Sequence, residues 1–352
     1  MLVIDSSYFL TSSHFICKED GFHWSSEMPE NYLYSHDFPE LAEIMGIEIQ
    51  PMIPESYTRS AKILNINPPW CFYIGKEKFL KIINSYSQSY FKFINSFDRE
   101  NINIHIKIGS FLKSLKGCRY NPTNIDPELS SHFDRSIKDC LVDGFIEPPK
   151  YFRTKSKTGR LSVKSGPNVL NMHAGLRKGI VDGFSIDFIS MEPNLLLALQ
   201  NRSPKTNLYE SIRFDVFENK ISRAKVKIAT MAALYGSNRS DKFAKKISEY
   251  FNLEVQVSAL EKKVKNDTIR NEYGRLIHLN GARDRHLLSL WLQSSAADAA
   301  LFGFYNFYND NDIVPHWIIH DGLIFIYKGS KKEIKTLDVG LGIELPVKIE
   351  KL

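Results

Sequence analysis

The 352-residue sequence is poor in cysteine and has no long hydrophobic run. Its four cysteines, Cys17, Cys71, Cys118 and Cys140, lie far apart and form no CxxC pair. This spacing excludes a zinc knuckle and a disulfide scaffold, and it is typical of a reducing cytoplasm. No apolar stretch reaches the roughly 18 residues that a membrane-spanning helix needs, so we expect no membrane partner. Metal binding by thiolates is thereby excluded, whereas metal binding by carboxylates stays open.

The N-terminal part has few cations, and its first acid, Asp5, has no partner carboxylate close behind it in the sequence. Asp5 follows the strand-like MLVI, but no second acid stands two residues later, as a two-metal nuclease built on that strand would need. Residues 1–74 hold ten acidic residues against three cations, a net charge of −7, which leaves +13 for the rest of a chain whose total is +6. We therefore predict an acidic module over residues 1–74 that is a scaffold or a docking surface for another protein.

The rest of the chain is basic in two stretches. Residues 76–119 have apolar residues at helical spacing with nine cations against three acids, and Lys150–Lys164 has six cations and no acid. Charge of one sign on helices is usually a solvated face. Two such stretches close together favour contact with the phosphate backbone of a nucleic acid.

A helix is predicted over residues 221–238, ISRAKVKIATMAALYGSN. Arg223, Lys227, Met231 and Tyr235 recur at every fourth position and share one broad face. Two cations one turn apart, followed by an apolar residue and an aromatic one, suit a ligand with a polyphosphate at one end and a base at the other. A solvated helix with basic residues on its surface is the alternative.

Two aspartates stand near the ends of predicted strands. Asp187 follows the alternating Phe184-Ser-Ile186, and it either caps the next helix or holds a divalent cation. Asp321 lies in the turn of the hairpin WIIHDGLIFIY, residues 317–327, where an Asp-Gly pair can simply form the turn. If the two strands are adjacent, the pair offers hard oxygen ligands for Mg²⁺. Between them, Gln293 and Asp298 are polar residues in an apolar, small-residue helix.

From about Tyr151 onward these segments, in this order, resemble the polymerase domain of family A DNA polymerases, the DNA polymerase I class. Six segments of this chain are similar to motifs of the family, in the same order: TGRLS (158–162), PNVLN (167–171), SIDFISMEPN (185–194), RAKVKIATMAALYG (223–236), QSSAADA (293–299) and HDG (320–322). The corresponding family motifs are, in turn, TGRLS, PNLQNIP, DYSQIELR, R-x3-K-x7-YG, QGTAADL and HDE. A fingers histidine of the family is matched loosely by Tyr209.

The resemblance implies an α+β fold shaped as a right hand, with an antiparallel palm sheet and helical fingers and thumb. Residues 75–150 correspond to the thumb, 151–200 to the first part of the palm, 201–280 to the fingers with helix 221–238, and 281–352 to the second part of the palm with hairpin 317–327. It further implies a template-directed DNA polymerase that uses two Mg²⁺ ions, for which Mn²⁺ can substitute, in the cytoplasm of a bacterial or phage-infected cell, associated with the nucleoid.

The resemblance also assigns residue roles. Asp187 and Asp321 correspond to the catalytic metal ligands, and Glu192 to the residue that blocks a ribose 2′-hydroxyl. The dNTP-binding positions are Arg223, Lys227, Met231 and Tyr235. The positions that contact primer–template DNA are Arg160, Asn168, Asn171, Gln293 and His320. No proofreading nuclease signature is present, so we expect any exonuclease, clamp or helicase on a separate chain.

Two residues depart from the family pattern. Met231 stands where family A enzymes carry Phe or Tyr and is similar instead to single-subunit RNA polymerases, whereas Glu192 and the segment 293–298 favour DNA. Gly322 replaces the Glu of HDE. The alternatives are therefore an RNA polymerase or primase-like enzyme, and a polymerase-like nucleic-acid-binding protein with impaired catalysis.

Overall fold

The computed structural model describes residues 1–4, 8–9, 13–18, 20–29, 33–35, 38–45, 49, 52–66, 69–97, 100–153, 157–236 and 242–352. Asp5 and the last two residues of the predicted helix 221–238 lie outside these ranges. The chain forms two compact units, Met1–Ile102 and Asn103–Leu352, and each has its own core. None of the helices in the described ranges is long and apolar enough to cross a membrane.

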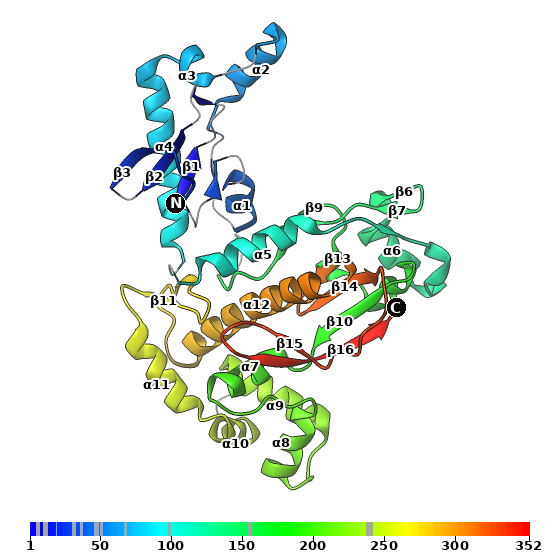
Figure 1. Ribbon diagram of the computed structural model, residues 1–352. Coiled ribbons are helices and arrows are strands. Elements are labelled where there is room, and N and C mark those ends of the chain that lie inside the picture. The colour runs from blue at the N-terminus through cyan, green and yellow to red at the C-terminus, as the bar shows by residue number, and fades with distance from the viewer. Residues whose placement is uncertain are drawn as a thin grey trace. The chain divides into compact units, whose positions relative to one another are not determined.

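The first unit combines a small sheet with helices (Figure 1). Its strands are β1 (Leu2–Ile4), β2 (His14–Lys18), β3 (Gly21–Ser25) and β4 (Leu33–Tyr34), and its helices are α1 (Phe38–Met45), α2 (Glu55–Leu64), α3 (Trp70–Tyr73) and α4 (Lys76–Asn95). The strand order is β3-β2-β1-β4, in which β1 runs antiparallel to β2 and parallel to β4.

Helix α4 belongs to this first unit because its apolar face packs against α1. The Phe38 ring lies edge-on to Tyr86, Tyr90 and Phe93, at centroid distances of 5.4, 5.4 and 5.5 Å. The division between the units therefore falls at residues 102 and 103, whereas the sequence suggested a boundary at residues 74 and 75. As a result, the two helices of the predicted basic region, α4 and α5 (Ile102–Ser114), fall on opposite sides of the boundary.

The second unit holds most of the elements. Its remaining helices are α6 (Ser130–Ser136), α7 (Met191–Leu199), α8 (Leu208–Phe217), α9 (Arg223–Tyr235), α10 (Lys242–Tyr250), α11 (Leu253–Lys263) and α12 (Asp284–Asp310). Its strands are β5 (Cys118–Arg119), β6 (Leu141–Val142), β7 (Phe145–Ile146), β8 (Lys150–Phe152), β9 (Ser162–Ser165), β10 (Phe184–Phe188), β11 (Thr268–Arg270), β12 (Leu276–His278), β13 (Ile313–Ile319), β14 (Gly322–Tyr327), β15 (Thr336–Asp338) and β16 (Glu344–Lys351). Short 3-10 helices occupy Pro122–Asn124, Pro127–Leu129, Lys138–Cys140, Val169–Asn171 and Ala174–Gly179.

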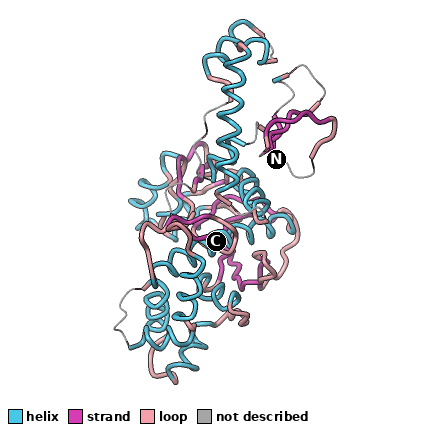
Figure 2. The backbone as a smooth tube through the Cα atoms, turned by 90° about the vertical axis from the view of Figure 1, so that its left-hand side faces the viewer, coloured by secondary structure: helices cyan, strands magenta, loops and turns pink. Residues whose placement is uncertain are grey.

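A five-stranded antiparallel sheet is the centre of this unit. Its order is β13-β14-β10-β16-β15, so that β10 lies between the hairpin and the C-terminal strand. Helix α12 crosses the sheet (Figure 1), and aromatic pairs join the two: Phe188 with Phe304 at 5.3 Å, and Phe325 with Phe307 at 5.1 Å. Helices α8, α9 and α10 pack against one another, and α9 also packs against α12; Figure 2 draws these and the other described helices in cyan.

The elements that the sequence predicts around the candidate residues are confirmed. The alternating segment is β10, the hairpin is β13 and β14, and the small-residue helix is α12. Helix α9 begins where the Ser222 side chain accepts a hydrogen bond from Lys225 N–H at 3.3 Å, and it ends at Gly236, whose φ of +73° favours glycine. A mixed helix and antiparallel-sheet fold is thus observed.

Candidate active site

Asp187 and Asp321 come together where the end of β10 meets the turn between β13 and β14. In the antiparallel register of β10 and β14, Asp187 lies opposite Gly322, the residue that follows Asp321. The Phe188 N–H donates a hydrogen bond to the Asp321 carbonyl at 3.1 Å, which ties the end of β10 to the hairpin turn. The predicted adjacency of the two strands is therefore confirmed, whereas the role of these aspartates as metal ligands stays a prediction.

The surroundings disfavour negative charge on both aspartates. Burial is the largest cause that raises the pKa of Asp187, and the cations Arg177 and Lys348 only partly oppose it. Burial also raises the pKa of Asp321, and the nearby charges of Glu192 and Asp187 raise it further. Such a pair is stabilised by a bound cation, because the cation offsets both the desolvation and the mutual repulsion.

The side chains of Asp187 and Asp321 offer carboxylate oxygens, the ligands that Mg²⁺ prefers in proteins. Within the described ranges, no group of three or more His, Cys, Asp or Glu residues is arranged to hold a metal ion by itself. Mg²⁺ usually keeps several waters and is bound by one or two carboxylates together with substrate phosphates, rather than by a cage of protein ligands. Two adjacent carboxylates are what such a site requires of the protein, so the residues present fit the ion.

A cavity of about 260 Å³ opens beside Asp321. It is built from four segments that lie far apart in the sequence. Its lining residues are Arg160, Leu161 and Leu170 from the basic loop region, Met191 and Glu192 from α7, Ala296, Ala297, Ala300 and Leu301 from α12, and His320 and Asp321 from the hairpin turn. The alanines leave room in front of α12, so an apolar wall faces a rim of charged groups.

Glu192 is the hub of the polar contacts in this cavity. Its Oε1 accepts a hydrogen bond from Tyr235 Oη at 3.0 Å and another from Arg160 Nη2 at 2.7 Å. The Glu192 side chain is only 15% exposed, whereas that of Arg160 is 48% exposed. Burial and the neighbouring Glu192 carboxylate raise the pKa of Tyr235, so its hydroxyl remains a donor at neutral pH. The cavity is thereby connected to the last turn of α9.

The remaining residues of the α9 face run outward from this contact. Met231 and Tyr235 are half-buried, and Arg223 and Lys227 are exposed. The guanidinium of Arg223 lies 5.6 Å from the centre of the Tyr209 ring, and its Nε lies 4.0 Å from Glu210. The predicted sharing of one face is therefore consistent with the structure, and Tyr209 lies beside its first cation.

Three predicted DNA-contacting residues do not line the cavity as far as the described residues show. Asn168 and Asn171 are exposed and lie next to each other, with Asn171 Nδ2 3.4 Å from Asn168 Oδ1, while Leu170 between them faces the cavity. Gln293 is half-buried and donates to Ser289 Oγ within α12 at 3.0 Å. Of the predicted site residues, the cavity lining includes Arg160, Glu192, His320 and Asp321. Asn168, Asn171 and Gln293 lie outside this lining.

Several charged residues outside the cavity lining were not predicted from the sequence. Arg177, in the 3-10 helix Ala174–Gly179, and Lys348, in β16, partly offset the unfavourable environment of Asp187, but single cations at such positions carry no sequence signal. Arg153 and Arg275 pair with Asp298 in the core. The position of Asp298 inside an apolar helix could have indicated a buried partner, because an unpaired buried charge is costly, but only the fold identifies these two arginines as that partner.

No family model matches the chain, and no curated protein is significantly similar to it. Among solved structures, the chain resembles the POL domain of Pol1 from M. smegmatis, which was solved in complex with DNA primer-template and dNTP. The sequences are 16% identical and the TM-score is 0.43, over 77% of this chain and 52% of the other. This chain thus spans about half the length of that one. A likeness this distant does not support an argument about function. The functional argument rests on the residues of the site itself.

Proposed function

We propose that the protein is a template-directed DNA polymerase that extends a primer 3′-hydroxyl with dNTPs by two-metal nucleotidyl transfer. The observation that carries the proposal is that Asp187 and Asp321 lie together where β10 ends beside the turn between β13 and β14. Next to them is a cavity in which Glu192 accepts hydrogen bonds from Tyr235 and Arg160. In this proposal the central sheet with α12 is the palm, the helices α8 to α11 are the fingers, and residues 103–150 of the same unit supply the thumb.

The chain's own residues perform binding and positioning. Asp187 and Asp321 would hold two Mg²⁺ ions, or Mn²⁺ in their place, and such ions activate the attacking hydroxyl and neutralise the leaving pyrophosphate. Arg223 and Lys227, which are exposed on α9, would offer cationic donors to the triphosphate. Little covalent chemistry falls to the protein, because alignment of the two reactants supplies much of the rate enhancement.

Glu192 and its neighbours define the nucleotide pocket in this proposal. The carboxylate is fixed by two donors, so it cannot swing away from a sugar that carries a 2′-hydroxyl. The small side chains of Ala296, Ala297 and Ala300 leave space on the opposite wall. Primer–template DNA is the proposed polyanion for the basic segments, with a salt-dependent affinity.

The direct test is primer extension. Purified protein with primed template, dNTPs and Mg²⁺ should extend the primer, and Asp187→Ala or Asp321→Ala should reduce extension below detection. Asp312→Ala is a matched control, because Asp312 is an aspartate at the other end of the same hairpin. Extension by either of the two site variants at the wild-type rate would refute the assignment of the metal ligands.

A second candidate, an RNA polymerase or primase-like enzyme, is favoured by Met231 alone. Parallel reactions with rNTPs and dNTPs decide between the two. We expect wild type to prefer dNTPs and Glu192→Ala to lose most of this preference. A wild type that prefers rNTPs, with no effect of Glu192→Ala on sugar choice, would support the second candidate.

A further inference from the structure

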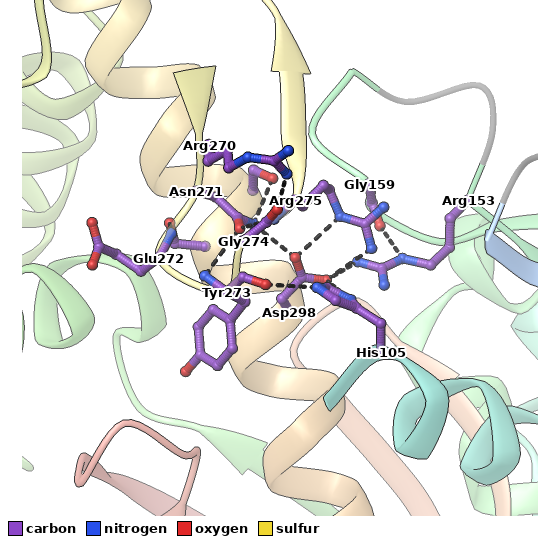
Figure 3. A network of polar contacts seen from close by, with 12 residues as sticks. His105, Arg153, Gly159, Arg270, Asn271, Glu272, Tyr273, Gly274, Arg275 and Asp298 are labelled. Atoms are coloured by element: carbon purple, nitrogen blue, oxygen red, sulfur yellow. Dashed lines mark hydrogen bonds and ion pairs between the residues drawn. The ribbon is translucent and has the colours of Figure 1, made fainter. Parts of the chain in front are cut away.

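A cluster of ionised side chains is buried in the larger unit, outside the cavity (Figure 3). Its centre is Asp298 of α12, whose side chain is fully buried. Asp298 Oδ1 accepts hydrogen bonds from Arg153 Nη2 and from Arg275 Nη2, the latter at 3.1 Å. Its Oδ2 accepts from Arg275 Nε at 3.1 Å and from Asn271 Nδ2 at 2.7 Å. Every lone-pair direction of this carboxylate is thus occupied by a donor.

The cluster carries a net positive charge. His105 Nε2–H donates to the Tyr273 carbonyl at 2.7 Å, and burial lowers the pKa of His105 to about 3, so this ring is neutral at neutral pH. Burial lowers the pKa of Arg153 to about 10, which still leaves it protonated. Two guanidiniums therefore share one carboxylate. Buried ionic clusters are seldom more stabilising than well-packed apolar residues, which favours a role in fixing geometry.

The geometry that this cluster fixes is a turn at the cavity. Arg153 Nε donates to the Gly159 carbonyl at 2.6 Å, while the other side of the same guanidinium pairs with Asp298. Gly159 has φ of +69°, and a Cβ there would lie 2.8 Å from Arg275 Nε and 3.1 Å from Arg153 Nη2. The backbone at Gly159 therefore lies directly against both guanidiniums, an approach that only glycine permits.

The next residue after this turn is Arg160, which donates to Glu192 Oε1 at 2.7 Å. We infer that Asp298 and Arg153 are positioning residues, and that the buried pair holds the backbone at Gly159 so that Arg160 meets Glu192 at the cavity rim. Because Glu192 also accepts from Tyr235, the same turn influences where the carboxylate lies relative to α9. The consequence for dNTP use rests on the proposed function, whereas the structural link does not.

Arg153→Lys tests the link with little change of charge. Lysine still offers a cation to Asp298, but its single nitrogen cannot serve both Asp298 and the Gly159 carbonyl as a planar guanidinium does. We expect backbone amide hydrogen exchange in a peptide containing Gly159 and Arg160 to accelerate about 10-fold or more. We also expect kcat/KM for dNTP incorporation to fall about 10-fold, which corresponds to the loss of roughly one charge-assisted hydrogen bond.

A double-mutant cycle separates positioning from mere stability. If Arg153 acts through Arg160, then Arg153→Lys should lower kcat/KM in the wild-type background and cause no further loss in an Arg160→Ala background. Tyr273→Phe is a matched control: it removes the hydrogen bond from Tyr273 Oη to the Val339 carbonyl (2.7 Å) and leaves Arg153, Asp298 and Gly159 in place. It should change neither the exchange of the turn nor the dNTP kinetics.

Gly159→Ala breaks the same link from the other side and keeps both members of the buried pair. It should reproduce the kinetic loss, again only when Arg160 is present. Equal losses with and without Arg160 would overturn the inference, as would unchanged exchange of the turn in both Arg153→Lys and Gly159→Ala. If wild type itself extends no primer, the proposed function fails, but the exchange measurement still decides whether the buried pair holds the turn.

Discussion

Replacing Gly322 by alanine should reduce polymerase activity without unfolding the protein. Gly322 pairs with Asp187 across β10 and β14, and a Cβ at this position would overlap Asp187 Oδ1 and lie 3.1 Å from its Cγ and 3.4 Å from the Ile319 carbonyl. The obstructing atom is the end of a side chain, so the strand pairing can persist while the carboxylate retreats by roughly 1 Å to restore van der Waals distance. A misplacement of that size at a reacting centre costs about 100-fold in rate.

The assay is steady-state primer extension by Gly322→Ala, together with a thermal melt. We expect kcat to fall about 100-fold, and the melting temperature to fall by no more than a few degrees. Gly329→Ala is the matched control, because a Cβ there would meet Asp312 only at an ordinary contact distance of 3.4 Å. Wild-type extension by Gly322→Ala would refute this reasoning. Improved extension by Gly322→Glu would also refute it, and would indicate that the glycine marks a loss of function.

Two further predictions concern charge. Asp187→Asn and Asp321→Asn should each melt above wild type at neutral pH without divalent ions. Burial raises the pKa of both carboxyl groups, so ionising them costs the folded state stability as the pH rises above the unfolded pKa, and the neutral amide avoids this cost. Mg²⁺ should then raise the melting temperature of wild type and not of these variants, and lower melting temperatures for both would contradict the prediction. His105, whose pKa burial lowers to about 3, should make stability decline as pH falls from about 6.5 toward 3, by up to about 1.4 kcal/mol per pH unit, because only the unfolded chain takes up this proton. His105→Gln should flatten that slope in urea titrations between pH 4 and 7, and an unchanged slope would show that other groups cause it.

The candidate site also bears on what the two departures from the family pattern mean. Gly322 is the residue that leaves room for the carboxylate of Asp187, so the absence of a side chain there is compatible with an intact pair of aspartates. Met231 is half-buried on α9, one turn before the tyrosine that binds Glu192. It therefore remains the position at which sugar choice is best tested together with Glu192.

The local elements and the polar residues at their ends follow from the sequence alone. The alternation of Phe184, Ile186 and Phe188 specified β10, and the Asp-Gly pair specified the turn after β13, because strand periodicity and turn chemistry are set by near neighbours. The spacing of Arg223, Lys227, Met231 and Tyr235 likewise followed from the helical period alone. The same patterns could not place the boundary of the first unit, since the packing of α4 against Phe38 joins residues that are far apart in the sequence.

Which distant polar residues meet depends on the tertiary fold. The fold brings Glu192, Arg160 and Tyr235 into one cluster, and it gives Asp298 two buried arginines from other segments. The physical reason is that a long-range pair depends on sheet order and helix packing, which arise from the whole core and leave no periodic signature around either partner. The sequence thus identified the chemistry available to this protein, and the fold selected which of those groups can act together.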